Sequence, residues 1–276
     1  MQYFCIKKNM QKTMTMLLCA MTMGASAQTI EGYGEVDIDH GAHLLVGIEK
    51  EWANGWAVGG EAEYNGTIDL TQLFVQKTFG EWASVRVGKI TMPIGMANIY
   101  DRPTKHFTVS LPLEECYVLP EETNRIGMAM AGERRGWAYE VQVLVRDRQM
   151  AVVGRVERQA TDELHLGMSG YCDGQVVVSA DAEYQTDKFV ARGIATFSEE
   201  NNAAHMGIEA GYDILNGRGG QLGAFCRYDC LIADSSTHRL TVGINYRPVP
   251  FVSIKAEYTH GSEAQCGWGI GIGVTL

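Results

Sequence analysis

Apolar and polar residues alternate with a period of two through almost the whole chain after residue 30, and no other feature restricts the fold as strongly. This period places successive side chains on opposite faces of a β-strand. No segment shows a sustained helical period, so we predict an all-β protein of about 14 to 16 antiparallel strands without helices. The alternating segments are 30–39, 43–52, 55–65, 68–79, 82–90, 124–133, 136–147, 149–158, 162–171, 174–184, 187–197, 203–213, 219–230, 237–247, 250–260 and 266–276.

The two faces of these segments differ in chemistry. In 55–65, for example, one face carries Trp56 and Val58, and the opposite face carries Glu61 and Glu63. A soluble sandwich would show the same alternation, so this pattern alone leaves the environment of the apolar face open. No uninterrupted apolar run approaches the ~18 residues of a spanning helix, whereas a spanning strand needs only about ten residues.

Aromatic residues favour a membrane environment because they gather at the ends of the segments. Membrane barrels carry two such girdles, in which amphipathic rings lie at the depth of the lipid headgroups. We therefore predict a transmembrane antiparallel up-and-down β-barrel, with a soluble all-β fold as the alternative. The residues at one set of ends are Trp52, Trp56, Phe79, Trp82, Trp137, Tyr139, Tyr184, Phe189, Tyr246 and Phe251, and those at the other are Tyr64, Tyr171, Phe197, Tyr228 and Tyr258.

Two lysines interrupt the apolar faces. Lys50 lies on the same face as Ile48, and Lys77 lies on the same face as Val75. Both lysines are close to a predicted turn. A long lysine side chain at such a position reaches the headgroups, and a β-bulge is the alternative explanation.

The first 27 residues have the composition of an export signal. Lysines precede an apolar run over 14–23, and small residues occupy 24–27. We expect cleavage after Ala27, which leaves a mature domain of 28–276 in the outer membrane of a Gram-negative cell. A lipoprotein attached at Cys19 is less favoured, because the bulky Leu18 precedes that cysteine.

Charge and cysteine content exclude some classes of function. Removing the three lysines of residues 1–27 from the 23 basic residues leaves 20, against 33 acidic residues. Such an acidic chain argues against nucleic acid as a partner. The five remaining cysteines have no zinc-site or disulfide spacing, and Cys226 and Cys230 on one strand lie about 13 Å apart by strand rise. We interpret the cysteines as small apolar residues and expect no metal and no cofactor.

One connection is much longer than the others. Residues 91–124 hold four of the six prolines and no regular period. A loop of this length is usually functional. We interpret it as a constriction loop that follows the fifth strand, precedes the sixth and folds into the lumen of the barrel.

Short motifs around this loop resemble the porin O and P family of phosphate-selective porins. They are Val85-Arg86-Val87-Gly88-Lys89 before Pro93 and Gly95, and Tyr246-Arg247-Pro248 before Lys255-Ala256-Glu257-Tyr258. The resemblance implies sixteen strands, an inward third extracellular loop, a homotrimer, and passive diffusion of small hydrophilic solutes or ions. Two departures are evident. Anion selectivity in that family rests on arginines and lysines, whereas the inward faces of the first three strands are acidic here, so we do not transfer phosphate selectivity. The chain also ends in Leu276 instead of an aromatic residue.

The predicted lumen carries acidic groups on its first strands and basic groups on its later ones. Such an arrangement predicts a transverse field and a mild preference for cations, unless the groups pair across neighbouring strands. The loop candidates are Asp101, Arg102, Lys105, His106, Glu114, Glu115, Glu121 and Glu122, the acidic wall candidates are Glu31, Glu35, Asp37, Asp39, Glu49, Glu51, Glu61 and Glu63, and the basic wall candidates are Arg86, Arg125, Arg146, Arg155, Arg192, Arg227, Arg239, Arg247 and Lys255.

Other functions are less favoured by the sequence. A structural or adhesive barrel without conductance would share all these features. An outer-membrane hydrolase would need a nucleophile beside a base, and Ser262 near His260 and Ser236 near His238 lie in no recognisable motif. Five histidines near the predicted extracellular ends raise the idea of a metal or pH-sensing site, although loop residues of this type are mostly ordinary polar groups. They are His40, His43, His205, His238 and His260.

Overall fold

A computed structural model gives the arrangement of the chain. It describes residues 29–37, 41–80, 82–95, 98, 107–120, 122–146, 149–199, 202–215, 220–262 and 266–275. The expected signal segment 1–27 lies outside these residues.

Sixteen β-strands and one short helix make up the described part of the chain. The predicted strands differ from the observed ones by no more than a few residues at each end. The strands are β1 (Thr29–Asp37), β2 (Gly41–Glu51), β3 (Trp56–Tyr64), β4 (Ile68–Thr78), β5 (Ser84–Thr91), β6 (Asn124–Arg134), β7 (Trp137–Arg146), β8 (Gln149–Gln159), β9 (Leu164–Cys172), β10 (Val176–Gln185), β11 (Phe189–Ser198), β12 (Ala203–Asp213), β13 (Gln221–Ile232), β14 (Ser236–Val249), β15 (Val252–Gly261) and β16 (Gly267–Thr275), and the helix is α3 (Leu113–Tyr117).

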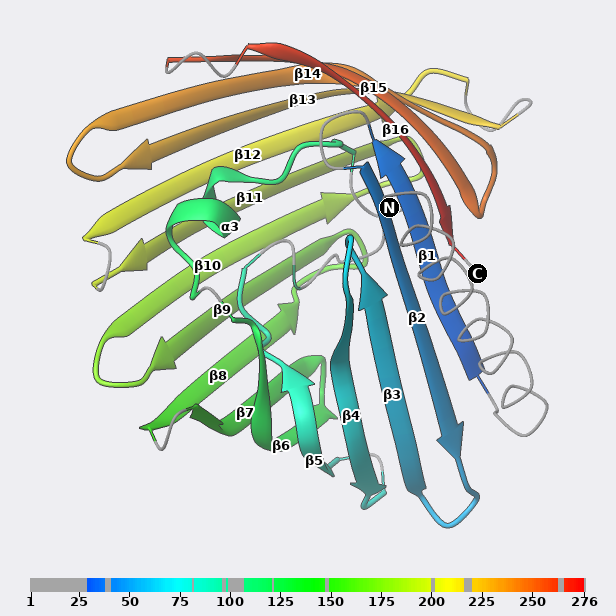
Figure 1. Cartoon of the computed structure of the whole chain (residues 1–276), viewed down its shortest axis with the longest axis vertical. Coiled ribbons are helices and arrows are strands. Elements are labelled where there is room, and N and C mark those ends of the chain that lie inside the picture. The colour runs from blue at the N-terminus through cyan, green and yellow to red at the C-terminus, as the bar shows by residue number, and fades with distance from the viewer. Residues whose placement is uncertain are drawn as a thin grey trace, which may run out of the picture.

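Each strand pairs with its neighbours in the sequence, and β1 pairs with β16, so the sheet closes into a barrel (Figure 1). All pairs are antiparallel, and closure runs from Tyr33 opposite Thr275 to Asp37 opposite Gly271. Closure removes the unpaired edges that an open sheet would expose. The prediction of an antiparallel up-and-down barrel with a long loop between β5 and β6 is therefore confirmed.

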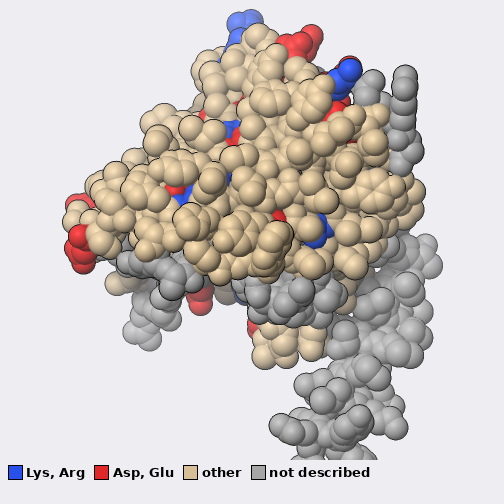
Figure 2. Space-filling view, turned by 90° about the horizontal axis from the view of Figure 1, so that it is seen from above, with Lys and Arg blue, Asp and Glu red and all other residues tan. Residues whose placement is uncertain are grey.

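The outer surface of the barrel is apolar. Along β16, for example, Trp268, Ile270 and Ile272 are exposed, while the glycines between them are buried on the inner side. Figure 2 shows the face that is uppermost in Figure 1, and charged residues are visible mainly at its edges. Lys77 shares the outer face, but its Nζ bonds the carbonyl of Asn54 in the adjacent turn. The side chain of this lysine therefore extends to the turn at the end of its strand, and a register irregularity between β3 and β4 lies near the other end of those strands.

Because the number of strands is even, the first strand begins and the last strand ends at the same rim of the barrel, which we call the terminal rim. The opposite rim, at which β5 ends and β6 begins, is the loop rim. Large exposed aromatic side chains lie at both rims. Trp82 and Trp137 lie at the terminal rim, and Phe197 and Tyr228 lie toward the loop rim. These positions match the two girdles predicted from the sequence.

The interior is filled in two places by apolar side chains. One cluster lies between the base of the long loop and the inner wall of β4–β10, and the other lies between α3 and the inner wall of β12 and β13. The expectation of a chain without helices was wrong. Pro112 precedes α3 with an extended backbone, and the short helix allows Leu113 and Val118 to pack beside Ala203 and Leu231, so burial stabilises a turn that has no helical period of its own.

No helix within the described residues is long and apolar enough to cross a membrane. The five cysteines of these residues are free, and Cys226 on the outer face of β13 is exposed. Cys172, Cys226 and Cys230 lie at outward positions of β9 and β13, which agrees with the interpretation that they serve as small apolar residues, whereas Cys116 lies on α3 and Cys266 precedes β16.

Candidate functional site

The described parts of the long loop, 92–95, 98, 107–120 and 122–123, lie inside the ring of strands (Figure 1). Its two ends are joined at the wall. The Met92 amide donates a hydrogen bond of 2.8 Å to the Thr123 carbonyl, and the hydroxyl of Thr91 lies 2.5 Å from the Asn124 side-chain oxygen. The buried Gln142 amide on β7 also donates to the Thr91 carbonyl at 2.8 Å. The loop therefore enters the lumen from a fixed base.

The base of the loop packs against an apolar part of the inner wall. Met92, Ile94 and Leu119 are buried, with Leu144 and Val153 among the wall residues of the same cluster. Inward positions of a water-filled barrel are normally polar. Apolar residues at these inward positions indicate that the loop covers this part of the wall and excludes water from it.

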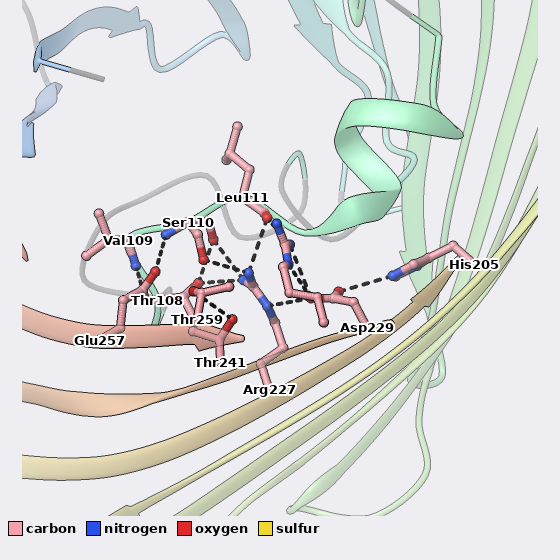
Figure 3. Close-up of polar contacts among 11 residues, drawn as sticks. Thr108, Val109, Ser110, Leu111, His205, Arg227, Asp229, Thr241, Glu257 and Thr259 are labelled. Atoms are coloured by element: carbon pink, nitrogen blue, oxygen red, sulfur yellow. Dashed lines mark hydrogen bonds and ion pairs between the residues drawn. The ribbon is translucent and has the colours of Figure 1, made fainter. Parts of the chain in front are cut away.

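Residues 107–111, which we call the tethered segment, lie against the opposite wall (Figure 3). Arg227 on β13 is 3% exposed. Its guanidinium donates to the Thr108 hydroxyl at 2.6 Å and to the Ser110 carbonyl and hydroxyl at 2.9 Å each, and also to the Leu111 carbonyl at 3.2 Å. One arginine thus binds four acceptor groups, on Thr108, Ser110 and Leu111, of a segment that has no regular structure.

Neighbouring strands complete the attachment. The Glu257 carboxylate on β15 accepts two consecutive backbone N–H groups, from Val109 at 2.7 Å and from Ser110 at 2.9 Å. Lys255 donates to the Thr108 carbonyl at 3.0 Å, and Arg239 on β14 donates to the Leu111 carbonyl. Because buried backbone groups must be paired, these charged side chains take the place that a neighbouring strand would have.

Phe107, at the start of the tethered segment, packs beside Phe225 with ring centroids 6.1 Å apart, and the Arg192 guanidinium lies 5.4 Å from its ring centroid. A Cβ atom at Gly211 would lie 2.7 Å from this ring. Glycine at that position therefore makes room for the loop on the wall.

The helix α3 carries two adjacent carboxylates in different environments. Glu114 is buried and accepts a hydrogen bond from the Thr196 hydroxyl on β11. Glu115 is only partly exposed, and desolvation raises its pKa to about 7, with repulsion from Glu114 as a smaller cause. Burial also raises the pKa of the next residue, Cys116. The loop therefore holds a carboxyl group that titrates near neutral pH.

Below the tethered segment, the charges of the later strands pair with one another. Asp229 contacts Arg227 at 3.0 Å, Arg239 at 3.2 Å and His205 at 3.1 Å. Arg192 lies between Glu183 at 2.5 Å and Glu209 at 2.9 Å. Cross-strand pairing, which the sequence left open as an alternative to a transverse field, is thus the observed arrangement on this wall.

Arg155 on β8 has the same kind of surroundings. It contacts Asp181 through two hydrogen bonds, of 2.7 and 2.9 Å, and Glu157 at 2.6 Å. Arg125 on β6 donates to the Tyr171 hydroxyl at 2.7 Å and lies 3.9 Å from Asp173.

The wall of β2, β3 and β5 is different. Glu63 pairs with His43 at 2.8 Å, and Glu61 accepts a hydrogen bond of 2.7 Å from Thr71. Glu49 lies on the same inner face, opposite Gly59. Arg86 bonds the Gln76 amide oxygen at 3.0 Å and lies over the Phe74 ring at 4.3 Å. The inward positions of β2 and β3 carry no lysine or arginine.

The structure places most of the predicted lumen residues on the inner side of the barrel. Arg86, Arg125, Arg239, Arg247, Lys255, Glu61 and Glu63 project inward from the strands, and Glu114 and Glu115 lie on α3. Asp101, Arg102, Lys105, His106 and Glu121 lie outside the described residues. The side chains of Glu31, Glu35, Asp37, Asp39 and Arg146 are also outside them.

Two residues that hold the tethered segment, Glu257 directly and Asp229 through Arg227 and Arg239, were not among the predicted lumen residues. Asp229 and Glu257 are polar residues at inward positions of strands whose alternate positions are apolar. That alternation could have identified their face. It could not have identified the loop atoms that Glu257 binds, because those atoms lie more than a hundred residues away in the sequence.

The predicted histidines do not gather into one site. His205 is buried beside Asp229, His238 bonds the Tyr228 hydroxyl at 2.8 Å, and His260 lies 3.3 Å from Cys266. Within the described residues no group of three or more histidine, cysteine or acidic side chains could hold a metal ion. His40 lies outside these residues.

No protein-family model and no curated protein sequence matches this chain. Solved structures of bacterial porins and other outer-membrane proteins are similar to it. An OmpF of Salmonella typhi in complex with daunomycin has 11% identity and a TM-score of 0.69, over 90% of this chain and 97% of that one. A Rhodopseudomonas blastica porin has 11% identity and a TM-score of 0.64, over 90% and 99%.

A Vibrio cholerae outer membrane protein, OmpT with loop L8 deleted, has 13% identity and a TM-score of 0.65, over 90% of this chain and 98% of that one. At these identities the likeness concerns the fold, which is that of a bacterial porin barrel.

Proposed function

We propose that this chain is an outer-membrane channel for the passive diffusion of small hydrophilic solutes or ions. The observation that carries the proposal is the combination of a closed barrel, an apolar outer face and a long loop bound inside a charged lumen. A barrel of sixteen strands is wide enough to leave a water-filled passage beside such a loop. In this arrangement the loop would set the width of the passage.

A mild preference for cations is part of the proposal. The basic groups Arg155, Arg192 and Arg227 are each bound to a carboxylate. On the wall of β2 and β3, the inward positions carry four carboxylates, Glu49, Glu51, Glu61 and Glu63, and no lysine or arginine. Net negative charge on a low-dielectric wall raises the local concentration of cations.

The export route, the surroundings and the oligomeric state of the chain are also part of the proposal. We propose export through a signal peptide that is cleaved after Ala27, outer-membrane lipid as the surroundings, and a homotrimer as the resemblance to the porin O and P family implies. Mass spectrometry of the mature N-terminus and chemical cross-linking in membranes test these points separately.

A channel without catalytic activity is favoured over a hydrolase. The Ser262 hydroxyl bonds the backbone of His238, while the His238 imidazole bonds Tyr228. A serine nucleophile would need the imidazole itself. Assays of lipid and peptide hydrolysis by the purified protein test this part of the proposal.

Conductance of planar bilayers under a KCl gradient is the decisive experiment. Discrete conductance steps with a reversal potential of the sign for cation preference would support the proposal, and the heat-denatured protein is the control. The second candidate is a non-conducting structural barrel, which the two apolar clusters inside the lumen favour. Protein that enters the bilayer and gives no steps would support that candidate and overturn the channel.

A further inference from the structure

Basic and aromatic side chains gather on one sector of the terminal rim, at the ends of β5 to β8. The β6–β7 turn consists of Arg135 and Gly136, both with positive φ (54° and 73°), which is the geometry of a tight two-residue hairpin. Arg134 ends β6 just before this turn, Arg135 lies in it, and Arg158 on the neighbouring strand β8 lies opposite Trp137. The basic-aromatic patch, as we define it, comprises Trp82, Arg134, Arg135, Trp137, Tyr139 and Arg158.

The patch is held rigidly by contacts between its own members. The Tyr139 hydroxyl donates to the Trp82 carbonyl at 2.8 Å, and a Cβ atom at Gly132 would meet both groups. Arg158 donates to the Arg135 carbonyl at 2.7 Å, and its guanidinium lies 5.1 Å from the Trp137 ring centroid. A prearranged surface loses little conformational entropy when it binds a ligand.

The patch borders a hollow of about 1010 Å³ lined by Trp82, Glu133, Arg134, Arg135 and Tyr139. Arg134 and Arg135 are exposed, and neither forms an ion pair with a carboxylate among the described residues. Glu133 is the acidic member of the lining and lies on the inward-facing register of β6, whereas Arg134 lies on the outward register. The outer side of the hollow is therefore basic.

Above the patch, the outer face of the same strands is apolar, with Met128, Met130 and Val156 about half exposed. A short way around the same rim the turns carry the opposite charge, with Asp162, Glu163 and Asp187. Cations beside aromatic rings, under an apolar wall, match a molecule with an anionic head and hydrocarbon tails. Arg134, Arg135 and Arg158 thus lie together in one sector, whereas Lys188 on the same rim lies beside Asp187.

We infer that the basic-aromatic patch binds a phospholipid with an anionic headgroup, in the leaflet that faces the terminal rim. Arg134 and Arg135 bind the headgroup phosphate, and Trp82 and Trp137 contact the upper part of the acyl chains. The inference rests on the membrane location in the proposed function, and it does not depend on whether the lumen conducts.

Native mass spectrometry of the full mature barrel in a zwitterionic detergent tests the inference. The protein is titrated with phosphatidylglycerol and, separately, with phosphatidylcholine of the same acyl chains. The test variant is Arg134→Gln/Arg135→Gln, which keeps the length and polarity of the side chains. The control is Lys188→Gln, which removes a cation from the same rim beside Asp187. The characteristic shift of folded barrels on unheated gels verifies that each variant is folded.

We expect the wild type and Lys188→Gln to retain phosphatidylglycerol more tightly than phosphatidylcholine. Loss of two cations should reduce that preference about twenty-fivefold, because each cation near an anionic lipid contributes roughly a factor of five. Equal retention of both lipids by the wild type, an unchanged preference in the double variant, or displacement of the lipid by inorganic phosphate would each overturn the inference.

The same preparations are assayed for conductance, which separates the two proposals. Lipid preference without conductance would overturn only the channel, and conductance without lipid preference would overturn only the lipid site. Failure of the protein to enter vesicles of either lipid would overturn both.

Discussion

The wall of β10 to β15 and the wall of β2 to β5 line the same lumen, but they use their charges differently. On the first wall Asp229 alone contacts two arginines and a histidine, and the arginines also bind the tethered segment 107–111. On the second wall Glu61 bonds a threonine and Glu63 bonds a histidine. The comparison teaches that charge in this lumen has two uses: on one wall it fixes the loop, and on the other it faces the passage that we propose.

The comparison is tested most strongly by Arg227→Ala against Arg86→Ala. Arg227 is buried and binds both Asp229 and the loop, so its truncation should lower the free energy of unfolding by about 3–5 kcal/mol. Arg86 donates to one amide oxygen, so Arg86→Ala should lower the free energy of unfolding by about 1 kcal/mol. Urea unfolding in lipid vesicles, followed by tryptophan fluorescence, measures both values. Equal losses would mean that the two walls do not differ in this way.

Helix α3 packs against β12 and β13 of the first wall, and its Glu115 makes the stability of the protein dependent on pH. Because the folded protein raises the pKa of this carboxyl to about 7, the folded state binds its proton more tightly than the unfolded state. The free energy of unfolding should therefore be highest below about pH 4.5 and fall as the pH rises to about 7, by at most about 3 kcal/mol.

Glu115→Gln should remove this part of the pH dependence, so that the variant is more stable than the wild type above pH 7. Glu122→Gln, at an exposed position in the same loop, is the control. The measurement is the unfolding free energy of each protein at several pH values. A difference between wild type and Glu115→Gln that does not change with pH would contradict the prediction.

Glu257→Gln tests the attachment of the tethered segment. The carboxamide keeps one acceptor but brings a donor toward a backbone N–H group, which should cost about 1–3 kcal/mol of stability. The freed segment should also increase the current noise of the open channel. Single-channel recordings of Glu257→Gln and wild type give the comparison, with Glu51→Gln, an exposed residue at the end of β2, as the control. Quiet currents from a fully stable variant would show that the tether is unimportant.

The smallest expected effect concerns selectivity. Glu49→Gln/Glu51→Gln should lower the cation-to-anion permeability ratio about twofold and change stability little, because both lie on the inward register near the end of β2, where β2 and β3 carry no lysine or arginine. Glu183→Gln/Glu209→Gln should instead reduce stability, because it leaves the buried Arg192 without either ion-pair partner. Reversal potentials and urea unfolding of both variants, measured together, sharpen the comparison between the walls. Identical behaviour of the two double variants would remove it.

Much of the fold was predictable because each strand carries its own pattern. The outward apolar positions of β16 and the inward polar positions of β13 follow from alternation alone. The loop was recognisable from its prolines and its length. Its contents were less so: α3 forms because Leu113 and Val118 find Ala203 and Leu231, residues distant in the sequence. The partners of Arg227 were unpredictable for the same reason.

By itself, the sequence determined the strands, their faces and the place of the long insertion, since a period of two is a local property that every strand expresses independently. Only the tertiary structure decided which carboxylate meets which arginine and which wall holds the loop. Those pairings depend on the register of neighbouring strands and on the path of the loop across the lumen. A contact between Glu257 and the backbone of residues 109 and 110 exists only after the barrel has closed around it.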